Sequence, residues 1–364
     1  MKIAFYGSSL LSSYWNGAAT YYRGLLKALA ALGYDITFYE PDVLDRQRHR
    51  DIAPPDWCDV VVYQATDEGL RAVVDQAAGA DVVVKASGVG FADDTLLVQT
   101  MAAARADALF IWWDVDAPAT LAEVHDDALH PLRGVLPKLD LVLTYGGGDP
   151  VVAAYRALGA PDCVPIYNAL DPATHHPVAP DERYAADLAF LGNRLPDREA
   201  RVEAFLLRPA EQLPAQRFLL GGAGWDDRAC PPNVVRVGHV RTEIHNAFNV
   251  TPRAVLNINR SSMAATGYSP PTRLFEVAGA GACLITDAWE GVEMFLAPGS
   301  EVLVARDGGD VVDIMQTLTA ERAAAIGQAG RRRILAEHTY DRRAAELHAV
   351  LQAALVNRRE VLAA

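Results

Sequence analysis

Cysteine is scarce in this sequence, and its thiols form no recognisable pattern. The 364 residues contain four cysteines, at Cys58, Cys163, Cys230 and Cys283, and no CxxC pair. Scattered cysteines in a large chain are usually buried thiols rather than members of a disulfide framework. The spacing therefore supports neither a disulfide scaffold nor a zinc site.

Long apolar runs are also missing. No stretch approaches the roughly 20 apolar residues that span a bilayer. Residues 1–7 form an apolar start that is too short, and too soon interrupted by glycine, for a signal peptide. They predict a first core strand instead. We therefore expect a cytoplasmic protein without a transmembrane segment.

Positive charge is in deficit. The chain has 33 Lys and Arg residues against 46 Asp and Glu residues, a formal net charge of −13. General nucleic-acid binding requires a basic face, so nucleic acid is not an expected partner. The one basic run, Arg331–Arg333, lies in a helical pattern of mixed charge and is interpreted as a solvated helix face.

Two widespread catalytic motifs are absent. The sequence contains no P-loop and no GxSxG nucleophile motif. The first strand is followed by Gly7-Ser8-Ser9, which is not a GxGxxG fingerprint. A glycine at the carboxyl end of a parallel strand still lets a ligand approach the backbone closely, so Gly7 is a candidate binding residue.

What the sequence does contain is enough apolar material for two cores. Hydrophobic residues form 51% of the chain and charged residues 22%, and this length fits two domains. Short apolar runs alternate with helical patterns such as Ala18–Leu32. The expected strands of the first half are Ile3–Tyr6, Asp35–Tyr39, Val60–Tyr63, Asp81–Lys85, Ala108–Trp113 and Asp140–Thr144. Runs that are apolar throughout are typical of parallel strands covered on both faces, which predicts a doubly wound α/β domain.

A second α/β series follows a break in this pattern. Residues 171–184 are rich in proline and lack periodicity, which indicates an interdomain linker. The expected strands beyond it are Leu188–Leu191, Phe218–Leu220, Val234–Val237, Ala254–Ile258, Cys283–Thr286 and Glu301–Val304. We expect domains at residues 1–170 and 185–339, and a C-terminal helix over 340–364 that packs back on the N-terminal domain. Two such domains enclose a cleft in which ligands generally bind.

The segment Gly267–Asp287 is the most informative part of the second series. Ser269 followed by proline is a favourable N-cap and first-turn pair, which predicts that a helix begins there. The free N–H groups and the dipole of such a helix suit a phosphate. Glu276 lies further along the helix, where its carboxylate can accept hydrogen bonds from sugar or ribose hydroxyls. The plain alternative is a capped helix with a surface glutamate.

This segment and those after it carry a family resemblance. The matching elements are Arg273-Leu274-Phe275-Glu276, Gly281-Ala282, Leu284-Ile285-Thr286-Asp287, Gly291-Val292-Glu293, Phe295, Pro298-Gly299-Ser300-Glu301-Val302 and His338-Thr339-Tyr340-Asp341-Arg342-Arg343. Together they resemble the C-terminal signature of the CgeB-like (spore-maturation type) glycosyltransferases. Weaker echoes occur at Phe190–Arg194, Gly221–Trp225 and Trp112–Pro118, so the resemblance is close in the C-terminal domain and loose in the N-terminal one.

The resemblance implies a GT-B architecture, with two Rossmann-like domains whose parallel sheets face a central cleft. It also implies that the C-terminal domain binds a nucleotide diphosphate-sugar donor, that the N-terminal domain binds the acceptor, and that no metal or other cofactor is required. In related retaining enzymes, two glutamates separated by seven residues hold the donor. Glu276 matches the second of them, but Tyr268 occupies the first position. The sugar contact and the retaining or inverting outcome are therefore left open.

Arginines near the strand ends are candidates for binding the donor diphosphate. Arg194 and Arg198 follow an expected strand, and Arg273 lies in the first turn of the expected helix. An arginine fork matches phosphate oxygens and stabilises the charge of a leaving diphosphate. The alternative for the first two is an exposed pair bonded to Asp197 or Glu199. The complete set of donor-site candidates is Gly7, Asn193, Arg194, Arg198, Gly222, Tyr268, Ser269, Thr272, Arg273 and Glu276.

Two carboxylates of the first domain are candidates for the general base. Asp114 and Asp116 follow the expected strand Ala108–Trp113, and an acceptor hydroxyl needs a carboxylate or histidine within hydrogen-bond reach. The same Asp-Val-Asp run has the form of the DxD site that binds Mg²⁺ or Mn²⁺ in the other large class of glycosyltransferases. The organisation of the C-terminal half argues against membership of that metal-dependent class. One of the two aspartates is also a candidate helix cap.

The loop after the first strand offers acceptor contacts. Trp15 could stack on a sugar and Asn16 could hydrogen-bond to it, although a plain surface loop is an equal alternative.

These observations predict a metal-independent glycosyltransferase. Two alternatives stay open: a nucleotide-sugar epimerase or hydrolase on the same fold, and a catalytically inactive binding or structural protein. The sequence does not identify the sugar, the base, the acceptor or the oligomeric state.

Overall fold

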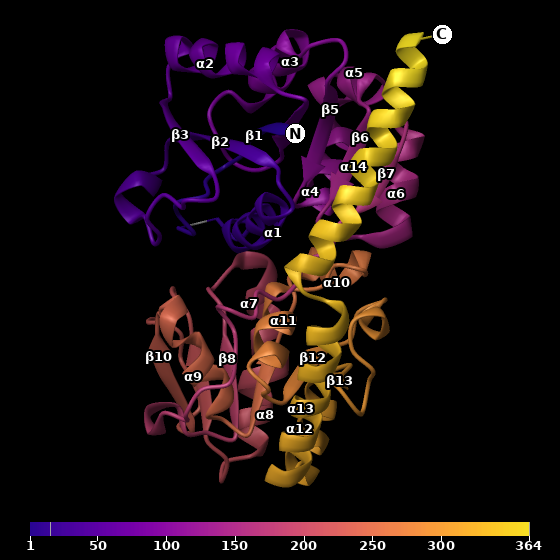
Figure 1. Cartoon of the computed structure of the whole chain (residues 1–364). Coiled ribbons are helices and arrows are strands. Elements are labelled where there is room, and N and C mark those ends of the chain that lie inside the picture. Colours follow the sequence, from indigo (N-terminus) through magenta and orange to yellow (C-terminus); the bar gives the residue numbers. More distant parts are fainter. Residues whose placement is uncertain (15, 364) are drawn as a thin grey trace. The chain divides into compact units, whose positions relative to one another are not determined.

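The computed structural model describes residues 1–14 and 16–363, and the chain divides into two compact units. The first unit comprises Met1–Tyr167 and Tyr340–Ala364, and the second comprises Asn168–Thr339. The second unit therefore includes residues 171–184, which we expected to form the linker. Figure 1 shows the helices and strands of both units.

The described residues of the first unit form a seven-stranded parallel sheet. Its strands are β1 (Lys2–Tyr6), β2 (Asp35–Asp42), β3 (Asp59–Gln64), β4 (Val82–Ala86), β5 (Leu109–Asp114), β6 (Leu141–Thr144) and β7 (Cys163–Pro165). The order across the sheet is β3-β2-β1-β4-β5-β6-β7, so the direction of winding reverses between β1 and β4. Strand β4 is buried along its whole length, because helices cover both faces of the sheet.

The helices of the first unit include one from the end of the chain. They are α1 (Ala19–Ala31), α2 (Asp67–Val74), α3 (Asp93–Ala103), α4 (Ala117–Asp126), α5 (Pro131–Val135), α6 (Gly148–Ala157) and α14 (Tyr340–Ala363), with short 3-10 turns η1 (Arg46–His49), η2 (Asp75–Gly79) and η3 (Leu136–Lys138). Helix α14 packs on α1 (Figure 1). A Cβ on Gly24 of α1 would lie 2.1 Å from the ring of Tyr340, so only glycine permits this close approach. Arg358 also bonds to the Ala106 carbonyl at 2.7 Å.

The described residues of the second unit form a six-stranded parallel sheet. Its strands are β8 (Leu188–Leu191), β9 (Phe218–Gly221), β10 (Val234–Gly238), β11 (Ala254–Asn257), β12 (Leu284–Asp287) and β13 (Leu303–Ala305). The order is β10-β9-β8-β11-β12-β13, which reverses between β8 and β11. Its helices are α7 (Pro196–Val202), α8 (Arg208–Gln212), α9 (His245–Val250), α10 (Ser261–Thr266), α11 (Thr272–Gly279), α12 (Gly308–Thr317) and α13 (Ala320–Glu337). A π-helical segment, η5 (Glu203–Leu207), joins α7 to α8, and short 3-10 turns are η4 (Glu182–Tyr184), η6 (Thr242–Ile244) and η7 (Val292–Met294).

Two details of the sequence interpretation were wrong. Strand β7 was missed, because its three residues end in proline and it lies at the edge of the sheet, where proline is tolerated. The helix expected to begin at Ser269–Pro270 begins at Thr272 instead. Pro271 is extended, with φ −68° and ψ 149°, and a proline also disfavours helical geometry in the residue before it. Because of the two prolines, the helix begins after Pro271 rather than at Ser269.

In the described part of the chain, no helix is long and apolar enough to cross a bilayer.

Candidate functional site

The topological switch point of the second unit brings two loops together. The winding reverses between β8 and β11, so the loops after these neighbouring strands leave the sheet at the same carboxyl edge. Arg260, after β11, donates to the Asp197 carboxylate at 2.7 Å, and the Ser261 hydroxyl donates to the Asp197 carbonyl at 2.9 Å. These bonds fix the start of α7 against the start of α10.

Arg198 is the basic residue at this point that has no carboxylate bonded to it in the described structure. Its Nη1 donates only a long bond, 3.5 Å, to the Asn193 carbonyl, and its buried Nε has no partner among the described residues. Burial lowers the pKa of Arg198, the charge of Asp197 opposes this effect, and the charges of Arg260 and Arg273 lower the pKa further. A buried guanidinium without a bonded carboxylate is an arrangement that an anion would stabilise.

Arg194 has a different environment from Arg198. Its guanidinium donates to the Glu199 carboxylate at 2.7 Å and to Asp227 at 2.8 Å. This is the kind of pairing that the sequence left open as the alternative. Its charge is already balanced within the chain, so Arg198 is the better placed of the two to bind an anion.

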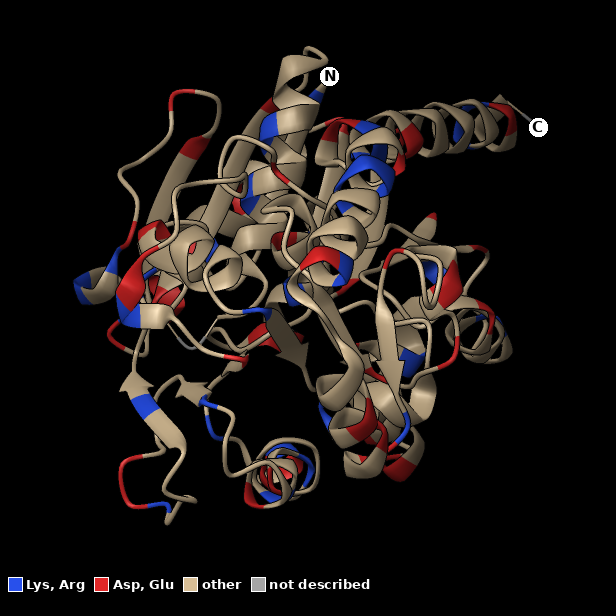
Figure 2. Cartoon of the chain, turned by 90° about the horizontal axis from the view of Figure 1, so that it is seen from below, with Lys and Arg blue, Asp and Glu red and all other residues tan. Residues whose placement is uncertain are grey.

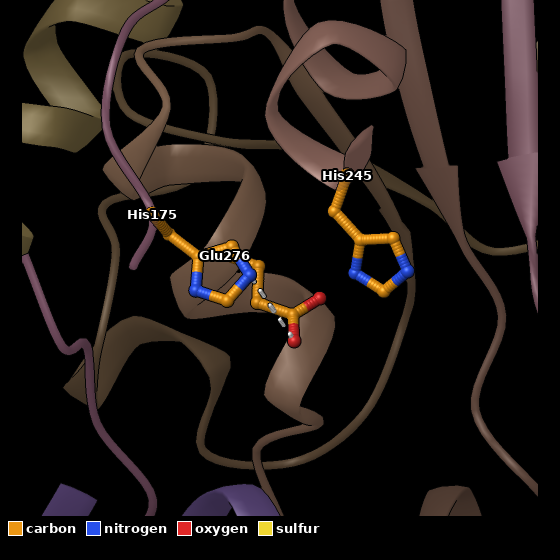
Figure 3. Close-up of side chains that lie close together, drawn as sticks. All are labelled: His175, His245 and Glu276. Carbon is orange, nitrogen blue, oxygen red and sulfur yellow. Dashed lines mark ion pairs between the residues drawn. The ribbon is translucent and has the colours of Figure 1, made fainter. Parts of the chain in front are cut away.

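Helix α11 brings Arg273 and Glu276 to the same buried position. Glu276 is 9% exposed, and its Oε2 lies 3.2 Å from Nη1 of Arg273. Its other oxygen, Oε1, lies 3.7 Å from Nε2 of His175, and His245 comes from α9 on the other side (Figure 3). The distance to Arg273 is that of an ion pair, but the two atoms have no hydrogen-bond geometry and no other partner among the described residues. Glu276 is thus held in place by charge while its carboxylate can accept hydrogen bonds.

The charges around Glu276 set its ionisation. Burial raises its pKa, but Arg273 first and then the two histidines lower it more, so the carboxyl is ionised below its usual pKa. Burial lowers the pKa of His245 to about 4, and Arg273 adds to the effect. At neutral pH the site therefore contains a carboxylate and an uncharged His245.

The residues before α11 form a strained turn. Tyr268 has φ +48°, which is unusual for a residue with a side chain. Its amide donates to the Glu290 carbonyl at 2.6 Å and its hydroxyl to the Glu290 carboxylate at 2.8 Å. Ser269 is buried, and the Thr272 hydroxyl accepts a bond from Asn168 at 2.9 Å. Glu290 was missed from the sequence because it belongs to the loop after β12, far along the chain from Tyr268.

Asn193 and Gly222 shape the loop after β8. The Asn193 side chain accepts a bond from the Ala223 amide at 3.0 Å. Gly222 has φ +115°, and a Cβ there would lie 2.1 Å from the Gly192 carbonyl oxygen. Glycine is therefore required for the loops after β8 and β9 to approach each other, and this contact positions the segment that carries Arg198.

The carboxyl edge of the second sheet also contains Asp287, a buried carboxylate that was not among the candidate site residues. Asp287 is fully buried and accepts a hydrogen bond from the Asn259 amide at 3.1 Å. Its Oδ2 also accepts a hydrogen bond from Nη2 of Arg201 at 2.6 Å. Burial raises its pKa, and Arg201 opposes that effect. Asp287 was not predicted because a residue at a strand end gives no sign of which loop it bonds to.

In the first unit, Asp114 is enclosed by hydrogen-bond donors. It is fully buried and accepts bonds from the Ser87 hydroxyl at 2.7 Å, the Asp116 amide at 2.9 Å, the Thr120 hydroxyl at 3.1 Å and the Tyr155 hydroxyl. Burial raises its pKa, and these donors lower it in part. Both oxygens are occupied by the protein, an environment that suits a structural carboxylate. Asp116 occupies the N-cap position of α4 and is half-buried.

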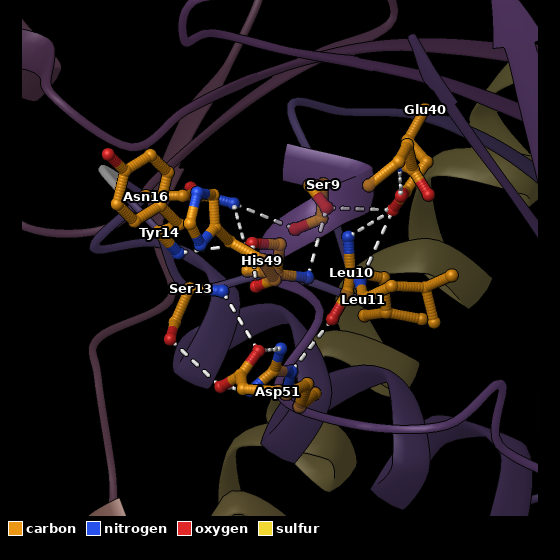
Figure 4. Close-up of polar contacts among 12 residues, drawn as sticks. Ser9, Leu10, Leu11, Ser13, Tyr14, Asn16, Glu40, His49 and Asp51 are labelled. Atoms are coloured by element: carbon orange, nitrogen blue, oxygen red, sulfur yellow. Dashed lines mark hydrogen bonds and ion pairs between the residues drawn. The ribbon is translucent and has the colours of Figure 1, made fainter. Parts of the chain in front are cut away.

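The loop after β1 is built from its own polar side chains (Figure 4). Asn16 is buried; it donates to the Ser9 carbonyl at 2.8 Å and accepts from the Ser8 hydroxyl at 3.0 Å. Buried Glu40 accepts from the Leu10 amide at 2.5 Å, which anchors the same loop. Trp15 lies outside the described residues. The side chain of Asn16 therefore holds the loop together from within.

Gly7 lies at the start of that loop. Its amide donates to the Tyr39 carbonyl at 3.1 Å, and a Cβ on it would lie 2.5 Å from the ring of Phe38. Packing against Phe38 is thus a sufficient reason for glycine at this position.

Charges of both signs are mixed along the exposed helices. Along α14, whose end is marked C in Figure 2, basic and acidic residues are interspersed. Arg333 pairs with Glu337 on α13 at 2.7 Å, a spacing of one helical turn.

Comparison with known proteins agrees with this architecture. Residues 198–349 match the model of a family described as glycosyl transferase-like. No curated protein sequence matches the chain. Over its whole length, the fold resembles sucrose-phosphate synthase from Thermosynechococcus elongatus, with a TM-score of 0.73, 15% identity and coverage of 98% of this chain and 100% of that one.

Two further structures contain nucleotide ligands. Anabaena HepE in complex with UDP and glucose matches with a TM-score of 0.68 and 14% identity, over 97% of this chain and 100% of that one. The T4 phage BGT in complex with UDP-glucose matches with a TM-score of 0.61 and 11% identity, over 98% and 99% of the two chains. The two parallel-sheet units therefore have the GT-B fold, as the resemblance implied.

Proposed function

We propose that this GT-B glycosyltransferase-type enzyme moves a sugar from a nucleotide diphosphate donor to an acceptor hydroxyl without a metal ion. The observation that carries the proposal is buried Arg198, which bonds to no carboxylate in the described structure, together with the ion pair between Arg273 and ionised Glu276 on α11. A guanidinium without a carboxylate and a buried hydrogen-bond acceptor match a ligand that has a diphosphate beside a sugar.

The roles follow from the charges. Arg198 and Arg273 would bind the diphosphate, since arginine presents fixed donors to phosphate oxygens. Glu276 would accept hydrogen bonds from ribose hydroxyls. As the bond between the sugar carbon and the diphosphate oxygen breaks, its electron pair goes to that oxygen, and the arginines stabilise the developing charge.

The acceptor side belongs to the first unit in this proposal. The acceptor oxygen forms the new bond to the sugar carbon, and its proton goes to a base. Asp116 is the better candidate of the two aspartates, because the oxygens of Asp114 already accept hydrogen bonds within the protein. Residues 273–302 and 338–343 support membership of the CgeB-like group.

Product analysis with radiolabelled donors tests the proposal. UDP-sugars are the first to try, since HepE and the T4 phage BGT have been solved with UDP or UDP-glucose. Label transferred to an acceptor from a cell extract is the expected result. Rapid formation of an epimer or of free sugar from donor alone would show a different reaction. Absence of binding to every nucleotide diphosphate would indicate an inactive protein.

A further inference from the structure

One nitrogen of His175 and one of His245 point at the carboxylate of Glu276 from two sides (Figure 3). Nε2 of His175, Nδ1 of His245 and Oε2 of Glu276 are all buried and have no hydrogen-bond partner among the described residues. Ligand atoms of the three residues lie within 4.8 Å of one another. Buried polar groups are nearly always paired, so this cluster indicates a place that a ligand completes.

The outer partners of the two imidazoles determine which nitrogen carries the proton. The Thr174 hydroxyl donates to the Asp171 carbonyl at 3.1 Å, so its oxygen accepts from Nδ1 of His175 at 3.0 Å. Nε2 of His245 lies 3.1 Å from the Val240 carbonyl oxygen, which can only accept. In each neutral imidazole the outer nitrogen is therefore the donor, and the inner nitrogen, which belongs to the cluster, has a lone pair.

Three lone pairs that converge without a hydrogen between them are satisfied together by a cation. A water molecule or a pair of hydroxyl groups supplies two hydrogens and leaves the third acceptor unpaired. A metal ion is bound by all three atoms at once, and two imidazoles with one carboxylate are the protein ligands of zinc sites that keep one position open. Mg²⁺ is a poorer match, because it prefers oxygen ligands.

The spacing of the three residues suits an ion of the size of zinc. Bond lengths of about 2.0–2.2 Å place the ligands of a tetrahedral Zn²⁺ about 3.4 Å apart. Oε1 of Glu276 lies 3.7 Å from Nε2 of His175, so this pair is already close to that separation. The three ligand atoms lie within 4.8 Å of one another, so a modest rotation of the His245 side chain closes the remaining distance.

The imidazoles and the carboxylate are oriented as metal ligands usually are. A metal-binding histidine almost always donates its other ring N–H to a further group, which fixes the ring, and Thr174 and Val240 are the groups that accept here. Arg273 approaches Oε2 of Glu276 at 3.2 Å, whereas Oε1 is the oxygen that faces His175. The arginine therefore anchors one oxygen, and the other is directed into the cluster.

The positive charge of Arg273 limits how tightly a cation binds. Arg273 is paired with Glu276, so the two side chains together contribute no net charge, and both imidazoles are neutral when their inner nitrogens have lone pairs. A cation therefore gains less from the surrounding charges than it does at a site with several carboxylates. We expect reversible binding that a competing ligand can displace.

We propose that His175, His245 and Glu276 form a binding site for a divalent transition-metal ion of the Zn²⁺ type, and that the bound ion excludes the nucleotide donor. The second half of the proposal rests on the proposed function, in which Glu276 accepts hydrogen bonds from ribose hydroxyls. A carboxylate that coordinates a metal is no longer open to those hydroxyls, so the metal and the donor compete for one group. The ion takes no part in sugar transfer; the metal-free chain is the active form.

Direct titration of the full, metal-free chain tests the site. Zn²⁺ is added with a chelating dye as competitor, and Co²⁺ is added separately, because its visible spectrum reports the ligands around it. H175F and H245F keep an aromatic ring and remove a ligand nitrogen. H176F is the matched control, because His176 is the exposed neighbour of His175. Thermal unfolding without metal confirms that each variant is folded.

We expect wild type and H176F to bind one Zn²⁺ per chain, and Mg²⁺ should not displace it. Affinity should be at least about 100-fold weaker in H175F and H245F, since loss of even an outer partner of a metal ligand weakens binding about 10- to 100-fold. Absence of stoichiometric binding by wild type overturns the site, as does binding that both variants retain. The Co²⁺ spectrum of wild type needs no variant: four- or five-coordinate bands are expected, and the spectrum of the hydrated ion overturns the site.

Competition with nucleotides tests the exclusion. Binding of UDP, GDP and ADP is measured by calorimetry with and without Zn²⁺, and a chelator buffer fixes the free metal concentration, so that chelation by the phosphates does not change it. At a free Zn²⁺ concentration ten times its Kd, nucleotide affinity should fall about tenfold in wild type and remain unchanged in H245F.

The outcomes separate the two proposals. Nucleotide and Zn²⁺ that bind together overturn the exclusion. Nucleotide binding without Zn²⁺ binding overturns the metal site and leaves the proposed function standing. Zn²⁺ binding without binding of any nucleoside diphosphate overturns the proposed function and the exclusion, and supports the metal site alone.

Discussion

The hydroxyl of Tyr268 donates a 2.8 Å hydrogen bond to the Glu290 carboxylate, and the amide of the same tyrosine bonds to the Glu290 carbonyl. Two bonds to one residue hold Tyr268 at φ +48°, directly before the helix that carries Arg273 and Glu276. A loop after β12 therefore fixes the entry to α11.

The first prediction concerns this pair. Y268F removes the hydroxyl and should lower the free energy of unfolding by about 1 kcal/mol, the usual contribution of one hydrogen bond. E290Q keeps an oxygen that can accept the hydrogen bond, so it should lower the free energy of unfolding by less than Y268F does. Urea denaturation of both variants measures the difference, and an E290Q more destabilising than Y268F would contradict this account.

The second prediction concerns Arg198. R198A should weaken binding of a nucleoside diphosphate about 10- to 100-fold, because it removes a guanidinium that bonds to no carboxylate among the described residues. R332A replaces an exposed arginine on α13 and is the control. Calorimetry on both variants provides the test, and equal affinities would remove Arg198 from the donor site.

The third prediction separates Asp114 from Asp116. D114N places an amide donor against groups that themselves donate, so it should lower stability by about 2–4 kcal/mol. D116N should leave stability within about 0.5 kcal/mol and lower the rate of sugar transfer. D126N, at an exposed position on α4, is the stability control. A stable D114N would show that the enclosed carboxylate is not structural.

The proposal that the reaction needs no metal ion is tested with EDTA. The oxygens of Asp114 are occupied by protein donors, so we expect full activity in the chelator. Activity that EDTA abolishes and Mg²⁺ or Mn²⁺ restores would assign the Asp114 and Asp116 pair to a metal instead.

The fourth prediction concerns pH. The pKa of His245 is about 4 in the folded chain and about 6.5 when unfolded, so between these values the unfolded chain binds more protons. Acidification therefore destabilises the fold, by about 2 kcal/mol for this residue between pH 7 and pH 5. H245F should lose that share of the pH dependence and H176F should keep it. In NMR titrations, one imidazole should titrate near pH 4 and vanish in H245F.

The fifth prediction concerns Gly222. G222A combines a left-handed backbone with a Cβ at 2.1 Å from the Gly192 oxygen, and should cost about 3 kcal/mol or more and weaken nucleotide binding. G299A is matched, because Gly299 has φ +84° but open space around it, and should cost only about 1–2 kcal/mol. Similar losses in the two variants would mean that the clash is relieved by movement of the loop.

The positions of the strands along the chain were the easiest part to predict from the sequence. Leu188–Leu191 is apolar throughout and is a strand with those bounds, because a run of this kind is stable only when helices cover both faces. The start of α11 was missed, since a serine before proline is a good cap unless a second proline follows. Local signals thus gave the elements, while their ends depended on neighbouring residues.

The site was harder to predict from the sequence, because the environment of each residue depends on partners far along the chain. Arg194 and Arg198 both follow β8, and only the folded chain shows that Glu199 and Asp227 neutralise the former. His175 was expected to lie in a linker and instead lies beside Glu276. No spacing in the sequence relates His175 to His245, since two separate segments bring them to α11.

Helix α14 makes the first unit discontinuous in the chain, because Tyr340–Ala363 packs on a helix that ends at Ala31. During synthesis, the early strands and helices leave the ribosome long before the helix that covers α1 exists. The surface around Tyr21 and Gly24, which Tyr340 contacts in the folded chain, therefore stays uncovered until α14 has been synthesised. A premature stop codon after Thr339 would spare every residue of the second unit and still yield a polypeptide prone to aggregation.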